Sequence, residues 1–184
     1  MAQRNDDRLE YMILFFAAKA PDGKTKMAKY LWEADVEAFR RFGRSLSGRD
    51  LYLRLEHGPV PQNFDKALAK LREEGLLARE FLDKYGYREE RHHLADDAAV
   101  DFSVFSPEEV DVLHTAIVRL QDLSARQASE RTHDAYWEEL ALGGRMFVSA
   151  GAVVEGEVTE EALAWAESVR KEIIEEEASL QEIE

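Results

Sequence analysis

The chain of 184 residues contains no cysteine, only four prolines and no apolar run long enough to cross a membrane. The absence of cysteine excludes disulfides and thiolate metal sites, and it is typical of a protein kept in a reducing cytoplasm. A transmembrane helix needs about 20 apolar residues, and no stretch approaches this length. The apolar run at residues 11–18 follows acidic residues and precedes no small-residue cleavage site. We therefore expect no signal peptide and a cytoplasmic protein.

Common catalytic and metal-binding motifs are also missing. The sequence contains none of the patterns H-E-x-x-H, C-x-x-C, G-x-x-x-x-G-K-[ST], G-x-S-x-G or G-x-G-x-x-G. His92 and His93 are adjacent on an expected strand, so their side chains point to opposite faces and cannot chelate one ion together. His114 lies within an expected helix without an acid four residues further on. The sequence therefore predicts no catalytic residue, no metal site and no cofactor.

Charge is abundant but uneven, with a formal net charge of −14 for the whole chain. Residues 1–60 contain 11 Lys and Arg against 9 Asp and Glu, a net charge of +2, whereas residues 61–184 contain 13 against 29, a net charge of −16. An acidic chain repels polyphosphates, because nucleic-acid affinity comes largely from cations that displace counterions. The sequence therefore predicts no strong nucleic-acid binding and favours a protein partner with a basic surface.

Hydrophobic periodicity predicts about seven helices. The expected helices span residues 8–19, 25–42, 61–74, 106–122, 125–131, 134–142 and 159 onward. Gly43 is placed to end the second helix, and Ser106 followed by proline and two acids is a strong start for the fourth. We expect Thr132-His133 to cap the sixth helix. The apolar segment 147–154 is compatible with a loop or with a small hairpin.

Strand-like patterns occur at residues 51–55, 76–82 and 87–94, with a turn at 83–86. Pro59 and Pro61 are expected to exclude a regular element between the first strand and the third helix. A helix followed by a hairpin is typical of a winged-helix unit. The predicted fold is therefore α+β and predominantly α-helical, with a small antiparallel sheet and a winged-helix-like element in the N-terminal half.

Four segments carry distinctive motifs. Residues 26–35 are K-M-A-K-Y-L-W-E-A-D, residues 43–48 are G-R-S-L-S-G, residues 58–61 are G-P-V-P, and residues 123–133 contain L-S and T-H ahead of Trp137. In this order the segments resemble the motifs of bacterial SocA-like antitoxins, which carry the Panacea domain. The resemblance covers roughly residues 20 to 140. It divides the chain into a Panacea-like domain at 1–142 and a C-terminal extension with an acidic helix at 143–184.

This resemblance implies an antitoxin of a bacterial or phage-borne toxin–antitoxin system. Such a protein neutralises a toxic partner, encoded beside it, by direct binding, and some members deliver the bound toxin to an AAA+ protease as an adaptor. The chain departs from the family where Met27, Ala28 and Trp32 replace larger aliphatic residues or tyrosine, and where residues 143–158 look like an insertion. It also lacks the separate N-terminal DNA-binding domain of some relatives, which puts repression of its own operon in doubt. The alternatives are a winged-helix DNA-binding regulator and an acidic, non-catalytic interaction module.

We expect the toxin to bind the second helix and the Gly-Pro-Val-Pro corner. Tyr30 and Trp32 are two apart on a helix and cannot both face the core, so one of them should be an exposed aromatic anchor. The remaining expected partner-binding residues are Arg40, Arg41, Arg44, His57, Gly58, Pro59, Val60 and Pro61. Three alternatives stay open: the arginines form a solvated face neutralised by nearby acids, the corner is only a structural bend, and the acidic run 172–184 is the docking arm.

Overall fold

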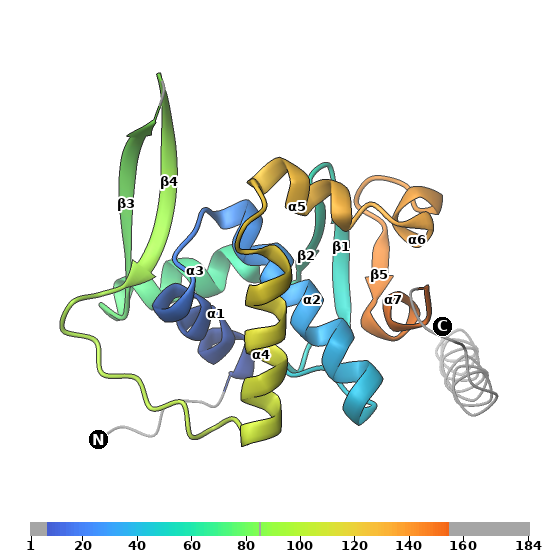
Figure 1. Cartoon of the computed structure of the whole chain (residues 1–184), viewed down its shortest axis with the longest axis horizontal. Coiled ribbons are helices and arrows are strands. Elements are labelled where there is room, and N and C mark those ends of the chain that lie inside the picture. Colours follow the sequence, from blue (N-terminus) through green and yellow to red (C-terminus); the bar gives the residue numbers. More distant parts are fainter. Residues whose placement is uncertain (1–6, 85, 155–184) are drawn as a thin grey trace, which may run out of the picture.

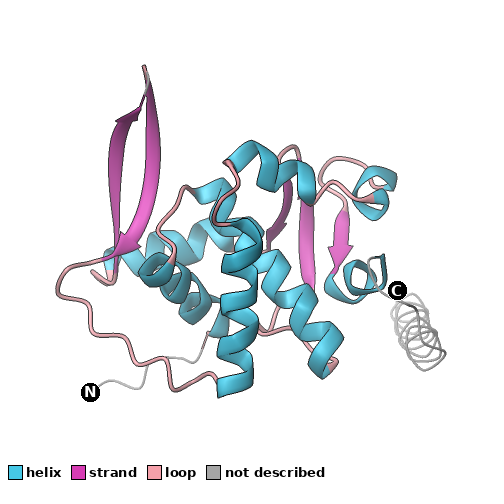
Figure 2. Cartoon of the chain, viewed as in Figure 1, coloured by secondary structure: helices cyan, strands magenta, loops and turns pink. Residues whose placement is uncertain are grey.

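A computed structural model describes residues 7–84 and 86–154 of the chain (Figure 1). The described elements are α1 (Arg8–Lys19), α2 (Lys24–Phe42), β1 (Leu51–Leu55), β2 (Gly58–Pro61), α3 (Phe64–Glu73), β3 (Leu77–Lys84), β4 (Tyr87–Leu94), α4 (Pro107–Leu120), α5 (Ala125–Arg131), α6 (Ala135–Glu139), β5 (Arg145–Phe147) and α7 (Val148–Val154). Figure 2 shows helices and small antiparallel sheets together, as expected for an α+β fold. Helices make up about half of the described residues, which does not confirm a predominantly helical protein. The helix expected from residue 159 lies outside the described residues.

Helix α2 occupies the centre of the described structure (Figure 1). Helices α1, α4, α5 and α7 and strand β2 all contact it. Twelve of its 19 residues are buried, more than the single apolar stripe of a surface helix would give. The helix ends at Gly43, which adopts the left-handed conformation with φ of 68°, as the sequence predicts.

The buried carboxylate of Asp35 joins α2 to the chain that follows it. One carboxylate oxygen accepts hydrogen bonds from the backbone N–H groups of Leu46 at 2.8 Å and Ser47 at 2.9 Å. The other accepts from the Tyr52 hydroxyl at 2.7 Å and from the Ser47 hydroxyl. Burial raises the pKa of Asp35 to about 6, and the hydrogen bonds oppose that rise. One side chain thus fixes both the turn at 45–48 and the start of β1.

Strand β1 lies between β2 and β5 in a three-stranded antiparallel sheet. Pro59 and Pro61 are part of β2, so the expectation that they exclude regular structure was wrong. The Pro59 carbonyl accepts a hydrogen bond from Lys29 Nζ at 2.9 Å, outside the β1–β2 pair. In an antiparallel strand, the backbone N–H and C=O groups of every second residue point away from the neighbouring strand. Two prolines spaced by two can both occupy such positions, so neither removes a hydrogen bond between the strands. The following helix starts at Phe64 rather than at Pro61.

Strands β3 and β4 form a separate hairpin that projects from the body (Figure 1). At its base, the backbone N–H of His92 donates to the Asp22 carbonyl at 2.9 Å, which ties β4 to the turn before α2. The sequence predicted one sheet from β1, β3 and β4, but β1 pairs with β2 and β5 instead. The winged-helix-like element is therefore not confirmed.

Two helix starts were predicted with different success. Ser106 caps α4 in a complete capping box with Glu109, as its sequence indicates. Helix α6 is capped by Asp134, whose side chain accepts from the Trp137 N–H at 2.8 Å, and not by Thr132-His133. The Thr132 hydroxyl instead donates to the carbonyl of Ser129 within α5.

The segment left open as a loop or hairpin forms strand β5 and helix α7. Strand β5 pairs with β1, and α7 packs against α2. The contact with α2 is close, because a Cβ added at Gly151 would lie 2.5 Å from a ring carbon of Trp32. Residues 145–154 therefore share a core with the segments that carry the motifs.

Replacing Asp35 with alanine is expected to lower the free energy of unfolding by about 3 kcal/mol or more, because two buried amides and two buried hydroxyls lose their acceptor. Asp35→Asn should cost less, since it keeps one acceptor oxygen. Urea denaturation followed by circular dichroism measures both. The control is Asp111→Ala, which removes a carboxylate that is 65% exposed and should change stability by less than about 1 kcal/mol. Equal losses for the two alanine variants would contradict the role of Asp35.

Candidate functional site

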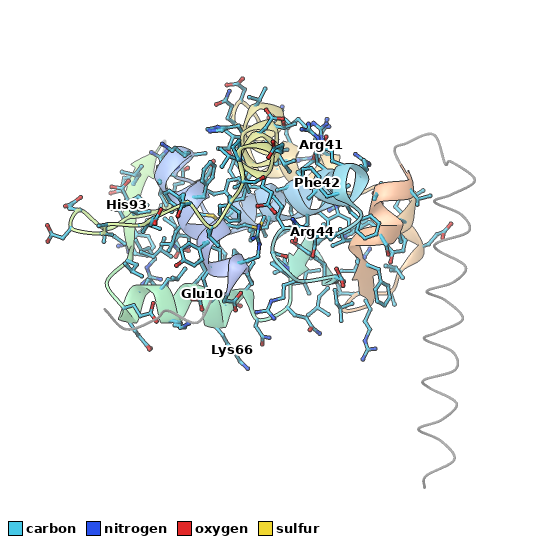
Figure 3. The ribbon with its side chains drawn as sticks, turned by 90° about the horizontal axis from the view of Figure 1, so that it is seen from below. Glu10, Arg41, Phe42, Arg44, Lys66 and His93 are labelled. Atoms are coloured by element: carbon cyan, nitrogen blue, oxygen red, sulfur yellow. The ribbon has the colours of Figure 1, made fainter. Side chains whose placement is uncertain are left out.

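The basic residues at the end of α2 are engaged within the molecule. Arg40 donates to a carbonyl of α7 at 3.0 Å. Arg41 lies 2.6 Å from Asp111, and Arg44 lies 2.7 Å from Glu109. Figure 3 shows Arg41 and Arg44 together at the end of the helix. These pairs favour the interpretation of a neutralised, solvated face over that of an uncompensated basic rim.

Both aromatic residues proposed as anchors are buried, which corrects the expectation that one of them is exposed. Tyr30 is 1% exposed and stacks on Phe16 with ring centroids 5.2 Å apart. Trp32 is 4% exposed and meets the edge of Tyr52 at 5.0 Å. The expectation assumed that α2 has one buried side. It was wrong because α2 is covered on several sides, so residues two apart point into two different clusters.

The Gly-Pro-Val-Pro corner is held from inside by Lys29. This side chain is fully buried, and its ammonium donates to the Pro59 carbonyl at 2.9 Å. Burial lowers the pKa of Lys29 from 10.5 to about 7. Gly58 adopts φ of 96°, and a Cβ there would lie 2.7 Å from the ammonium and 2.5 Å from the Thr132 hydroxyl. Glycine is therefore required at this position by both conformation and space.

His133 and Trp137 of the last motif stack with Arg54 of β1, and this stack lies beside the Gly-Pro-Val-Pro corner. The rings of His133 and Trp137 are parallel, with centroids 3.7 Å apart. The guanidinium of Arg54 lies 3.7 Å from the Trp137 ring centroid. The pKa of His133 is lowered by burial and by the nearby charges of Lys29 and Arg54. We call this group, together with Gly58, Pro59 and Thr132, the corner cluster.

Residues 27–138 match the family model described as "Antitoxin SocA-like, Panacea domain". The chain belongs to the SocA-like antitoxin family. The match confirms the resemblance and covers more than half of the chain, from α2 to α6. No curated protein and no solved structure matches the chain.

In this Panacea domain the motif residues serve mainly inside the fold. Asp35 organises the 45–48 turn, Lys29 holds the corner, and Trp137 lies between Arg54 and His133. Of the predicted corner residues, Gly58, Pro59 and Pro61 are buried, Val60 is half-buried and His57 is exposed. The corner is therefore a built structural bend whose outward side chains remain available for contact.

An apolar surface that the sequence analysis missed lies on the far side of the three-stranded sheet. Residues paired across strands share one face of a sheet. Leu53 pairs with Val60 on β2 and with Arg145 on β5, and Leu51 pairs with Phe147. We call this surface the outer sheet face; its residues are Leu51, Leu53, Leu55, Val60, Arg145 and Phe147. The alternation of leucine with Tyr52 and Arg54 in β1 indicates a strand with two different faces, but it does not show which face is buried.

A cavity of about 580 Å³ lies where α1, α2, β4, α4 and α5 meet. Lys26 reaches into it and binds Asp22 and the Gln121 carbonyl, both at 2.9 Å. None of the described residues that line it is a histidine, so the cavity offers no nucleophile–base pair of the usual kind. Within residues 7–84 and 86–154, no three histidine or acidic side chains are grouped as metal ligands.

No helix among the described residues combines the length and apolar character needed to span a bilayer.

Because Lys29 is buried, we expect the free energy of unfolding to depend on pH in the alkaline range. Its pKa is about 7 in the folded chain and 10.5 when exposed, so between these values the unfolded chain binds a proton that the folded chain does not. The free energy of unfolding should therefore fall as pH is lowered from about 10 to 7, by at most about 1.4 kcal/mol per pH unit from this group.

Lys29→Met should flatten this dependence, because methionine has similar length and no proton to bind. Urea denaturation at several pH values between 7 and 10 measures the slopes. Lys66→Met is the matched control, since Lys66 is exposed on α3 (Figure 3). A slope that is the same in wild type and Lys29→Met would show that Lys29 is not titrating in this range.

Proposed function

We propose that this protein is an antitoxin that neutralises a cognate toxin by direct binding. The family match over residues 27–138 carries the proposal. The internal roles of Lys29, Asp35 and Trp137 support it, because these polar and aromatic motif residues stabilise a scaffold and form no reacting group. A scaffold of this kind acts by presenting a surface, so we expect stoichiometric binding rather than turnover.

The toxin-binding surface that we propose includes the outward side of the corner. His57 is the corner residue that is exposed to a partner, and Val60 is only half-buried although it packs partly against the main core. Arg41 and Arg44 are also on the surface, and their ion pairs with acids of α4 must rearrange or be shared if they take part. Because Tyr30 and Trp32 are buried, the aromatic anchor is no longer part of the proposal.

Delivery of the bound toxin to an AAA+ protease is a finer version of the same function. The acidic run 172–184 is the segment that we propose for such delivery or for contact with a basic partner. It lies outside the described residues, and its support is its composition, with six glutamates in 13 residues. Neutralisation that persists in cells lacking the protease would assign the effect to binding alone.

A DNA-binding regulator is the second candidate, and the charge of α3 argues against it. This helix would be the recognition helix of a winged-helix protein. Lys70 of α3 is bound to Glu10 at 2.7 Å. Asp65 of α3 pairs with Lys24 of α2. The α3 cations Lys66, Lys70 and Arg72 are matched in number by Asp65, Glu73 and the C-cap Glu74, so the segment has no net positive charge, whereas duplex binding depends on one.

Co-expression in a bacterial growth assay tests the antitoxin function. We expect wild-type protein to restore growth of cells that express the product of the neighbouring reading frame as a toxin. Asp35→Ala should protect poorly because less folded protein is present, whereas Asp111→Ala should protect as wild type does. Failure of wild type to protect against either adjacent gene product would contradict the proposed function.

Duplex DNA binding is expected to be weak at physiological salt. A specific protein–DNA complex typically has a Kd of about 10 nM or tighter, and an acidic chain with a neutralised α3 should not reach this affinity for its own promoter. Electrophoretic mobility shift at two salt concentrations measures it. Nanomolar binding with a steep salt dependence would instead support the regulator.

A further inference from the structure

The outer sheet face leaves an apolar surface uncovered in the described structure. Leu55 and Phe147 are each 40% exposed, and Leu51, Leu53 and Val60 are half-buried. The contacts of the sheet with helices are on its other side, where Tyr52 and Met146 are fully buried against Trp32 of α2 and Ala152 of α7. The three strands thus have one face in the core. On the other face Val60 packs partly against the main core, whereas Leu51, Leu53, Leu55 and Phe147 belong to neither core cluster of the described residues.

Hydrogen bonding and stacking fix which face of β1 points outward. The Tyr52 hydroxyl donates to Asp35 at 2.7 Å, and Arg54 lies over Trp137 at 3.7 Å, so both side chains must lie on the inner face. The leucines at 51, 53 and 55 are then turned outward by the two-residue period of a strand.

Arg145 stands within this apolar surface. It pairs with Leu53 in the ladder, and its side chain is exposed on the same face. Among the described residues it has no ion-pair partner. Arg145 lies on the edge strand β5, beside Leu53 and Phe147. An arginine next to apolar side chains contributes to an interface when a carboxylate meets it and water is excluded.

We propose that the outer sheet face is the docking surface for the toxin, and that the toxin presents an apolar patch with a carboxylate placed opposite Arg145. This inference rests on the proposed antitoxin function. The net charge of −14 disfavours a second copy of the chain as the occupant, because two copies repel each other. The same charge attracts a partner that is basic overall, and Arg145 then selects one acidic group on it.

The position of α7 also favours an external occupant over the rest of this chain. Gly151 packs against Trp32, so α7 lies on the inner side of the sheet. The described chain therefore ends at residue 154 on the side away from the outer sheet face.

The outer sheet face is large enough for the centre of an interface. Three strands spaced by about 4.8 Å and five residues spaced by about 3.4 Å cover roughly 240 Å², compared with about 800 Å² per partner in a standard interface. Leu142, which is 66% exposed, lies near one end of β1, because the neighbouring Gly143 donates to the Arg54 carbonyl at 2.7 Å.

Two variants of the full chain test the inference against the purified toxin identified by the growth assay. Leu55→Asp and Arg145→Glu should each weaken binding by about 30-fold or more in calorimetry, as expected for residues at the centre of an interface. Val118→Asp is the matched control, because Val118 is 68% exposed on α4, and it should bind within about 2-fold of wild type. Far-ultraviolet circular dichroism and the urea midpoint establish that all three variants fold.

The outcomes separate this inference from the function on which it rests. If wild type protects cells and binds the toxin while Leu55→Asp and Arg145→Glu bind equally well, the surface is wrong and the antitoxin function stands. If wild type neither protects nor binds, the function itself fails. A wild-type dimer that Leu55→Asp converts to a monomer in light scattering would assign the face to a second copy.

Hydrogen exchange tests whether the chain's own C-terminal segment occupies the outer sheet face. If a full-chain variant with Leu163→Asp and Val169→Asp exchanges faster at residues 51–55 than wild type, the face belongs to the chain's own C-terminal segment, and the inference is overturned. Unchanged exchange at these residues, together with the loss of toxin binding in the two face variants, supports the toxin as the occupant.

Discussion

The buried carboxylate of Asp35 is the interaction on which the rest of the structure depends. A charged group without a cation beside it is costly to bury, and here four donors from three residues offset that cost. Because two of these donors are backbone amides, the carboxylate determines the path of the main chain after α2. Because another is the Tyr52 hydroxyl, it also determines how β1 is rotated about its axis. Asp35 thus contributes to the orientation of the three-stranded sheet, together with the packing of Tyr52 and Met146 against Trp32.

Lys29 performs the complementary role about 1.7 turns earlier on the same helix. Asp35 accepts hydrogen bonds from N–H and O–H groups, whereas Lys29 donates one to the Pro59 carbonyl, which has no strand beside it. The two buried charges do not pair with each other, so each is free to bind a different part of the backbone. Helix α2 therefore acts as a template that positions both the 45–48 turn and the corner. Motif segments that are far apart in the sequence are therefore joined by the same contacts in the fold.

The sequence was sufficient where local rules decide the structure. The bounds of α1 and α5, the cap at Ser106 and the glycine end of α2 were predicted because they depend on neighbouring residues. Three features depend on distant partners and were not predicted. The prolines of β2 are tolerated because Lys29 binds the Pro59 carbonyl, and Tyr30 and Trp32 are both buried because helices cover α2 on several sides. The leucines of β1 point outward because Asp35 and Trp137 hold the alternate residues inside.

The family itself could be recognised from order and spacing, yet the same pattern did not show which motif residues are exposed. The motif residues Lys29, Tyr30, Trp32 and Asp35 are buried, so this part of the motif locates the scaffold. The outer sheet face drew no attention in the sequence because β5 joins β1 only in the folded chain, about 90 residues later.

The two prolines of β2 also decide how this sheet can grow. An exposed strand edge is a template on which another chain can polymerise, and each N–H that points outward is a point of attachment. Proline removes that group at positions 59 and 61, and the outward carbonyl of Pro59 is already taken by Lys29. Another copy of the chain made at the same time therefore cannot add a strand at the β2 edge. An acidic protein with a leucine-rich sheet is in this way protected against fibril formation at that edge, while its flat face stays open.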